Sequence, residues 1–262
     1  MKKLIVFVLI LTMLLCGCTD KVDYDPNLLE YPGLHWGMTF EEVQTVLGFT
    51  DGDILEKDLD QLDPEQPAVP AWHRYTVENV RIFGFPTAQV ELWFYEYTGH
   101  GPGLAEMVVY LPDGHCGTEA TDLDALCDVL QEYYGEWEEV IPSVMWNHHS
   151  GELERDEYIC DSDDNRGWIS KTTGRDLLTE AELERLYDTL AAGWTGSDST
   201  MKYPTFEQFC QSYENPAVKL WVEVERDEES LAIHRKYGRT GLRLFFNARL
   251  LVDVEAIDRY FE

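Results

Sequence analysis

Apolar and polar residues alternate along several stretches of the chain, and this alternation is typical of β-strands that bury one face. Strands are predicted over residues 72–83 (one strand or a pair), 88–97, 104–111, 218–225 and 240–247. Glycine and proline residues at 84–86 and 99–103 supply turns between the first of them. Because strands joined by such short turns run antiparallel, we expect an antiparallel sheet.

Helix starts are marked by a recurring pair of residues: a threonine, whose hydroxyl can accept from free backbone N–H groups, and an acid or amide three residues later. The pairs are Thr39/Glu42, Thr121/Asp124, Thr179/Glu182 and Thr205/Gln208. The first two helices are expected to end at Gly48 and Gly135. Together the elements predict the α+β class, with a mainly antiparallel sheet and helices packed on one face.

The predicted order of elements divides the chain into successive parts. They are a leader over 1–17, a short polar tether over 18–33, an α+β domain over 34–137, an irregular and helical insertion over 138–200, and an α+β segment over 201–262. We expect the last part to complete the sheet of the first domain and to end in a short acidic helix. As an extended chain the tether reaches at most about 50 Å, which keeps the domain near whatever holds residue 18.

The leader has the layout of a secretory signal peptide. Lys2 and Lys3 precede an apolar run over 4–15, which is shorter than the roughly 20 residues that a membrane-spanning helix needs. The run closes on Leu15-Cys16-Gly17-Cys18, and these four residues resemble a bacterial lipobox. The resemblance implies cleavage after Gly17, a lipid such as palmitate on the Cys18 thiol, and a protein held at the extracytoplasmic face of the cell membrane. An ordinary secreted protein and an uncleaved anchor are the alternatives.

The chain is strongly acidic. It carries 50 Asp and Glu against 20 Lys and Arg, a formal net charge of −30, and loss of residues 1–17 removes only two lysines and gives −32. With no basic surface to neutralise phosphates, nucleic acid is an unsuitable partner. Anionic lipid headgroups are repelled as well, so the lipid has to hold the protein against its own charge. The acidic surface serves solubility or the recruitment of a basic partner.

Cysteine usage leaves the disulfide state open. The residues that remain after cleavage and lipidation are Cys116, Cys127, Cys160 and Cys210. An exported compartment permits disulfides among them, with three possible pairings. Cys127 and Cys210 share helical faces with leucine and aromatic residues, which indicates small buried side chains.

No motif indicates catalysis, and we expect a non-enzymatic protein without a cofactor. A G-x-S-x-G elbow is absent, and the adjacent residues His115 and Cys116 do not aim their side chains at each other. Residues 148–154 combine two histidines with carboxylates but lack a second ligand cluster. Residues 161–165 open like an EF-hand loop, yet Arg166 stands where glycine is needed. No metal ligand is assigned. The alternatives are a calcium- or small-ligand-binding module over 148–165 and a hydrolase whose site is not visible in the sequence.

The predicted strands offer the best candidate site. Side chains alternate across a strand, so the aliphatic residues fall on one face of the sheet and the aromatic residues on the other. The aromatic set is Trp93, Tyr95, Tyr97, Tyr110, Trp221 and Phe245. Aromatic side chains serve both cores and binding surfaces. The set therefore binds a partner protein, or it is covered by residues 138–200, which contain Trp146, Trp168 and Trp194.

A family resemblance rests on the segment Trp36-Gly37-Met38-Thr39-Phe40-Glu41-Glu42-Val43, closing on Leu47-Gly48. It resembles the helix opening of small bacterial envelope lipoproteins, including the BamE/SmpA type and related uncharacterised lipoprotein domains. Tyr134-Gly135 is similar to a later helix end in such domains, and the resemblance covers roughly residues 33–137. It implies an envelope binding or scaffolding domain without catalytic residues. The expected shape is also similar to that of beta-lactamase inhibitory proteins, which grip a partner with an aromatic-rich sheet face. We therefore expect a membrane-anchored lipoprotein that binds an unidentified envelope protein.

Overall fold

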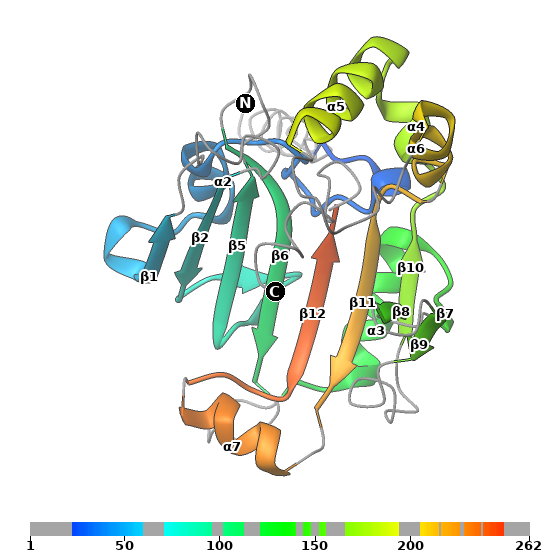
Figure 1. Ribbon diagram of the computed structural model, residues 1–262. Helices are drawn as coiled ribbons and strands as arrows, with labels where there is room; N and C mark the ends of the chain where they lie inside the picture. Colours follow the sequence, from blue (N-terminus) through cyan, green and yellow to red (C-terminus); the bar gives the residue numbers. More distant parts are fainter. Residues whose placement is uncertain are drawn as a thin grey trace, which may run out of the picture.

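The computed structural model describes residues 23–59, 71–95, 102–112, 121–139, 144–147, 152–155, 166–193, 205–214, 216–225, 228–236 and 238–248. Strands from both halves of the chain form one twisted sheet, with helices at its ends and on one face (Figure 1). The predicted α+β class, with a mainly antiparallel sheet, is confirmed. The lipobox with Cys18, the C-terminal acidic helix, Cys116 and Cys160 lie outside the described residues.

Within the described residues the main sheet has eight strands in the order β1-β2-β5-β6-β12-β11-β10-β7, and each neighbouring pair is antiparallel. The strands are β1 (Ile54–Leu59), β2 (Trp72–Val77), β5 (Gln89–Tyr95), β6 (Gly103–Leu111), β7 (Glu138–Glu139), β10 (Arg166–Ile169), β11 (Lys219–Val224) and β12 (Leu242–Asn247). The alternating stretches correspond to β2, β5, β6, β11 and β12, so those predictions are confirmed. The sequence reading missed β1 and β10.

The two halves of the sheet meet where β6 pairs with β12. Val109 lies opposite Leu244 and Met107 lies opposite Phe246 in this register. The segment after residue 201 therefore belongs to the same sheet as the strands before residue 112. The described residues also contain two small two-stranded sheets: β3 (Arg81–Ile82) with β4 (Phe85–Pro86), and β8 (Val144–Asn147) with β9 (Glu152–Arg155).

The helices of the described ranges are η1 (Pro26–Leu28), α2 (Phe40–Leu47), η2 (Asp51–Asp53), α3 (Leu123–Tyr134), α4 (Gly174–Leu177), α5 (Glu180–Gly193), α6 (Phe206–Ser212) and α7 (Glu228–Lys236). Thr39 caps α2 as predicted, and a reciprocal bond from the Thr39 N–H to Glu42 completes the capping box. Thr205 likewise caps α6. At α3 the predicted cap is wrong, because Asp122 rather than Thr121 accepts the bond from the Asp124 N–H. An Asp is as good a cap as a Thr, and here it stands one residue nearer the helix.

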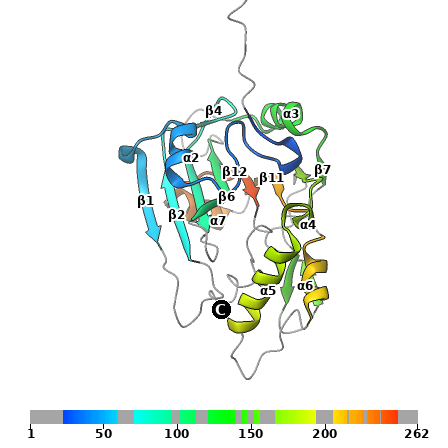
Figure 2. The ribbon, with the colours of Figure 1, turned by 90° about the horizontal axis from the view of Figure 1, so that it is seen from above.

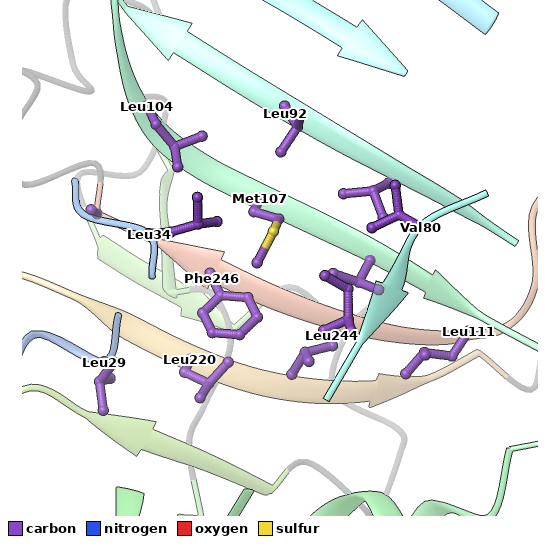
Figure 3. Packing of buried hydrophobic residues seen from close by; sticks show 14 of the residues in the cluster. Leu29, Leu34, Val80, Leu92, Leu104, Met107, Leu111, Leu220, Leu244 and Phe246 are labelled. Atoms are coloured by element: carbon purple, nitrogen blue, oxygen red, sulfur yellow. The ribbon is translucent and has the colours of Figure 1, made fainter. Parts of the chain in front are cut away.

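One face of the sheet, called the first face from here on, carries the main apolar core. Helices α2 and α3 and the β3–β4 hairpin lie in one layer on this side of the sheet (Figure 2). Val43 of α2 and Leu126 and Leu130 of α3 are fully buried in the same cluster as the inward side chains of the strands. Those strand residues include Leu92, Met107, Leu111, Leu220, Leu244 and Phe246 (Figure 3).

Residues 23–33 are packed against the domain, which corrects the expectation that a tether continues to residue 33. Leu29 is 3% exposed and lies in the main core, as does Leu34 (Figure 3). The buried Glu30 carboxylate accepts hydrogen bonds from the backbone N–H groups of Asp25 (2.8 Å) and Trp36 (3.4 Å). Leucine burial and this satisfied carboxylate explain why a segment that is polar on average is folded.

The region over 138–200 is more regular than predicted, because residues 166–169 form β10 within the main sheet. Trp168 is buried in the first-face core, and its indole N–H donates a 2.7 Å hydrogen bond to the Gly135 carbonyl. Helices α5 and α6 form a separate apolar cluster that contains Leu183, Phe209 and Tyr213. Cys210 of that cluster and Cys127 of α3 are buried free thiols.

Candidate functional site

The second face of the sheet, opposite the main core, gathers the aromatic residues that alternation predicted. Tyr110 lies opposite Arg243 of β12, and Phe245 of β12 lies opposite Trp221 of β11. In β5, Trp93 and Tyr95 face away from Leu92 and Phe94, which are in the main core. Tyr97 lies outside the described residues. The five described rings therefore share one face, although they come from four different strands.

These rings do not form an open patch, which corrects that part of the expectation. Tyr95 is 1% exposed, Tyr110 is 4% exposed and Trp221 is 8% exposed. Trp93 and Phe245 keep intermediate exposure. Trp168, one of the tryptophans considered as a cover for this face, lies on the opposite face. Contact with a partner is therefore available to Trp93 and Phe245 and not to the whole set.

Trp93 belongs to a small cluster that we call the Trp93 corner, made of Trp72, Arg74, Trp93 and Tyr95. The Trp72 and Trp93 ring centroids are 5.3 Å apart, and Trp93 stacks on Tyr95 at 6.4 Å with an interplanar angle of 12°. The Arg74 guanidinium lies 5.4 Å from the centroid of the Trp93 ring. Cross-strand pairing puts Arg74 directly opposite Trp93, which explains this contact.

The rim of the Trp93 corner is acidic. The Arg74 Nη2 atom lies 3.4 Å from a carboxylate oxygen of Glu56 and 3.4 Å from one of Asp58. Both acids belong to β1, the edge strand, and their side chains are about half exposed. Each of these two surface ion pairs adds little stability. Together they hold the Arg74 guanidinium against the Trp93 ring.

Towards the other end of the second face lies a network of charges. Glu91 of β5 forms an ion pair with Arg239, whose guanidinium lies 5.1 Å from the Tyr110 ring centroid. Burial raises the pKa of Tyr110 to about 12, with a further contribution from the Glu91 carboxylate. The Tyr110 hydroxyl therefore stays neutral at physiological pH and serves packing rather than proton transfer.

Arg243 connects this network to β11. It forms an ion pair with Glu223, lies 3.7 Å from Glu225, and stands 5.5 Å from the Phe245 ring centroid. Burial raises the pKa of Glu223, and Arg243 opposes that rise. The Phe245 ring in turn stacks on Trp221, with centroids 4.7 Å apart and the planes 5° from parallel.

His234 of α7 approaches the same network, because the helix lies in the connection between β11 and β12 (Figure 1). Its ring centroid is 6.2 Å from that of Tyr110. Burial, followed by the positive charge of Arg243, lowers the pKa of His234. The imidazole is therefore neutral in the folded protein at neutral pH.

Sequence reasoning missed the charged members of this face, although a signal for them exists. Glu91 stands between Val90 and Leu92, and Arg243 stands between Leu242 and Leu244. A charge at an alternate position inside an apolar strand marks a buried ion pair when the second face of the sheet is covered. Only aromatic residues were predicted for this face, so Glu91, Glu223, Arg239 and Arg243 were missed.

Two further features bear on chemistry. Within the part of the chain that the structure describes, no three acidic, histidine or cysteine side chains gather to form a metal-binding group. Over the same residues, no helix combines the length and the apolar character needed to cross a bilayer. The two loops with metal-type ligands fall largely outside the described ranges: of residues 148–165, only the β9 backbone at 152–155 is described.

Comparison with protein-family models, curated proteins and solved structures finds no match to this chain.

Proposed function

We propose that this chain is a lipid-anchored lipoprotein of the cell envelope, held at the extracytoplasmic face of the membrane through Cys18, and that its folded domain binds a partner protein without catalysing a reaction. The leader and lipobox support the location. The resemblance of residues 33–137 to envelope lipoprotein domains supports the same class. The observation that carries the binding role is the Trp93 corner, where an incompletely buried tryptophan is framed by an arginine and two further aromatic rings.

The composition of the Trp93 corner favours protein recognition. Tryptophan, tyrosine and arginine are enriched among the residues that dominate binding energy at protein interfaces. Trp93 is held by Trp72, Tyr95 and Arg74, so its ring is ordered before a partner arrives. An ordered anchor loses less side-chain entropy on binding.

The charge around the Trp93 corner indicates the chemistry of the partner. Glu56 and Asp58 stand at the rim with their side chains about half exposed, and the chain as a whole carries a net charge of −30. Complementary charge raises association rates and excludes like-charged partners. A partner surface with a central apolar contact and a basic rim fits this corner.

The polar groups of the second face support binding rather than catalysis. Glu91 and Glu223 are each engaged by an arginine, and the pKa of Tyr110 is raised to about 12. A general acid or base works best when its pKa is near the working pH and when it can reach substrate. Glu91 and Glu223 are buried and occupied by arginine, and the Tyr110 phenol is buried with a pKa far above neutrality, so none of the three is placed to exchange a proton with a substrate.

The test is a crosslinking pull-down from native membranes with the lipidated protein and its variants. Trp93→Ala is expected to lower partner recovery by a factor that corresponds to about 2 kcal/mol or more. The matched control is Trp137→Ala, because Trp137 is an exposed tryptophan (42%) away from this corner and should leave recovery unchanged.

Because Trp93 also contributes to packing, a second variant keeps the test independent of stability. Asp58→Lys changes an exposed side chain on β1, and because a surface ion pair adds little stability it should preserve the melting temperature. It should reduce recovery of a basic partner both through the reversed charge and through loss of one carboxylate that holds Arg74 against Trp93. Equal recovery with Trp93→Ala, Asp58→Lys and the unaltered protein would overturn the binding role. Intact mass of the membrane-extracted protein tests the anchor: a chain without acyl mass on Cys18 would overturn the lipoprotein assignment.

A further inference from the structure

The folded structure starts very close to the expected lipid-bearing residue. The Gly33 N–H donates a 2.9 Å hydrogen bond to the Asp23 carbonyl, and the Asp25 N–H donates a 2.8 Å hydrogen bond to the Glu30 carboxylate. The backbone is therefore fixed from Asp23 onward. Only residues 19–22 separate Cys18 from this point. Five Cα-to-Cα steps span at most about 17 Å, so a lipid on Cys18 holds Asp23 near the headgroup region of the bilayer.

The segment that follows Asp23 enters the molecule on its first face. Leu29 and Leu34 pack into the first-face core, and η1 contacts α3. Figure 2 shows this blue segment in the same layer as α2, α3 and β4, on one side of the sheet. Asp23, where the link from Cys18 joins the folded domain, is the attachment point. It lies on the first-face side of the sheet, opposite the Trp93 corner.

A row of partly buried aromatic residues in mutual contact begins beside Asp23. Tyr24, the second described residue, packs edge-on against Tyr133 of α3 with centroids 5.9 Å apart. Tyr133 lies 4.9 Å from Phe83 in the β3–β4 hairpin, and Phe83 lies 5.0 Å from Tyr31. All four rings have intermediate exposure. We call this group, Tyr24, Tyr31, Phe83 and Tyr133, the anchor rim.

We propose that the anchored protein lies with its first-face layer towards the bilayer, that the anchor rim contacts the headgroup region of zwitterionic phospholipid, and that the second face with the Trp93 corner points away from the membrane. The inference rests on the proposed lipid at Cys18. Tyrosine rings, which have an apolar body and a polar hydroxyl, favour the headgroup region of a bilayer, and three of the four rim residues are tyrosines. Anionic headgroups repel the anchored chain, whose net charge is −32 after loss of residues 1–17, so zwitterionic lipid is the expected occupant.

This orientation makes the lipid anchor compatible with binding of a partner at the Trp93 corner. A domain held within about 17 Å of the membrane hides whichever side carries the attachment point. Attachment on the first face leaves Trp93 and Phe245, on the second face, accessible to partners in the surrounding compartment. An attachment of the same length on the second face would press the Trp93 corner against lipid.

The experiment is hydroxyl-radical footprinting of the full lipidated protein in phosphatidylcholine vesicles, compared with residues 19–262 free in the same buffer. The oxidation rates of Tyr24, Phe83 and Tyr133 are expected to fall several-fold in the anchored protein. The rates of Trp93 and Phe245 should be equal in the two samples. High salt should leave the pattern unchanged, because the contact is not electrostatic.

Two controls isolate the geometry. A flexible Gly/Ser spacer of about 20 residues inserted after Asp20 lengthens the reach by roughly 25 Å and should restore oxidation of the anchor rim. Mass photometry of the free chain tests for a second copy as the occupant of the rim, and dimers whose anchor rim is protected without lipid would overturn the proposal.

The failure of this inference is distinguishable from failure of the anchor. Equal oxidation of the anchor rim with and without lipid, or protection of Trp93 and Phe245 instead, overturns the orientation while the anchor stands. Intact mass without acyl groups overturns the anchor and, with it, the native orientation. Coupling Cys18 of the mature chain to a maleimide lipid reproduces the same reach, and lack of rim protection in that sample would overturn the geometric argument itself.

Discussion

The side-chain hydroxyl of Tyr134 donates a 2.8 Å hydrogen bond to the main-chain carbonyl of Glu30, which lies 104 residues earlier in the chain. The bond connects the last turn of α3 to the segment that leads from the N-terminus into the core. Burial raises the pKa of Tyr134, so the hydroxyl remains a donor across the physiological pH range. Because α3 packs on the sheet, this contact adds to the burial of Leu29 in fixing the N-terminal segment against the main core.

Tyr134→Phe removes the donor and keeps the ring. The free energy of unfolding is expected to fall by about 1 kcal/mol, since the Glu30 carbonyl loses its partner in a partly buried place. Urea denaturation of the two proteins measures the difference. The matched control is Tyr133→Phe, where the ring contact with Phe83 is retained and a smaller change is expected. Equal losses in the two variants would contradict the assigned role.

Gly103→Ala is expected to destabilise the junction between β6 and the loop before α2. A Cβ atom on Gly103 would lie 2.8 Å from the Cα of Gly37 and 2.9 Å from its carbonyl oxygen, and both are backbone atoms. Overpacking of this kind costs about 1–3 kcal/mol. Thermal melting followed by circular dichroism should show the loss. At Gly52 the nearest atom to an added Cβ is 3.6 Å away, so Gly52→Ala should melt close to the unaltered protein.

Thr39→Ala removes the N-cap of α2, whose hydroxyl accepts from the Glu42 N–H. The expected cost is about 1 kcal/mol of unfolding free energy, with partner recovery unchanged because α2 lies on the first face. Thr45→Ala within the same helix is the control and should be neutral or slightly stabilising. Lost binding with unaltered melting would move the function from the second face to the turn before α2.

The His234 imidazole should make stability fall as the pH is lowered. Its folded-state pKa lies below the ordinary 6.5, so below that pH the unfolded chain binds a proton more readily than the folded one. The contribution of His234 to the free energy of unfolding is therefore fully present above pH 6.5. It is lost as the pH falls towards the folded-state pKa. His234→Gln should flatten this part of the curve in urea titrations at a series of pH values. A variant curve parallel to that of the unaltered protein would contradict the prediction.

Glu223 is a control because its effect on stability changes with pH in the direction opposite to that of His234. Its folded-state pKa lies above the ordinary 4.5, so the folded protein binds a proton more readily than the unfolded chain between these two values. Its contribution to stability is present below 4.5 and is lost as the pH rises through the folded pKa. Glu223→Gln should therefore remove a decline of stability with rising pH, the reverse of the change expected for His234→Gln.

Single helices and strands were predicted from the sequence better than the pairing of the strands in the sheet. Threonine pairs found the starts of α2, α5 and α6, and alternation found β5, β6, β11 and β12, because both signals depend on neighbouring residues. Strand β1 was missed since Ile54–Leu59 is an edge strand with mostly exposed side chains and no alternation. The order of strands was not predictable, since the pairing of β6 with β12 depends on contacts between distant segments.

The candidate site was predicted in part, for a similar reason. Alternation correctly assigned Trp93, Tyr110, Trp221 and Phe245 to one face. It gave no measure of exposure, which depends on what the rest of the chain places over that face. The Arg74–Trp93 contact joins two strands and needs the β2–β5 register to be seen.

The pairing of β6 with β12 has a consequence for the newly made chain. Strand β6 finds its first neighbour at once, because β5 immediately precedes it, but its second neighbour begins at Leu242. Because the ribosome makes the N-terminus first, one edge of the apolar strand β6 stays unpaired until β12, near the C-terminal end of the sequence, has been synthesised. Such an edge is a template for pairing with other chains. Holdase chaperones that recognise extended apolar segments are expected to bind nascent chains that stop short of β12, and to release them once Phe246 is in place.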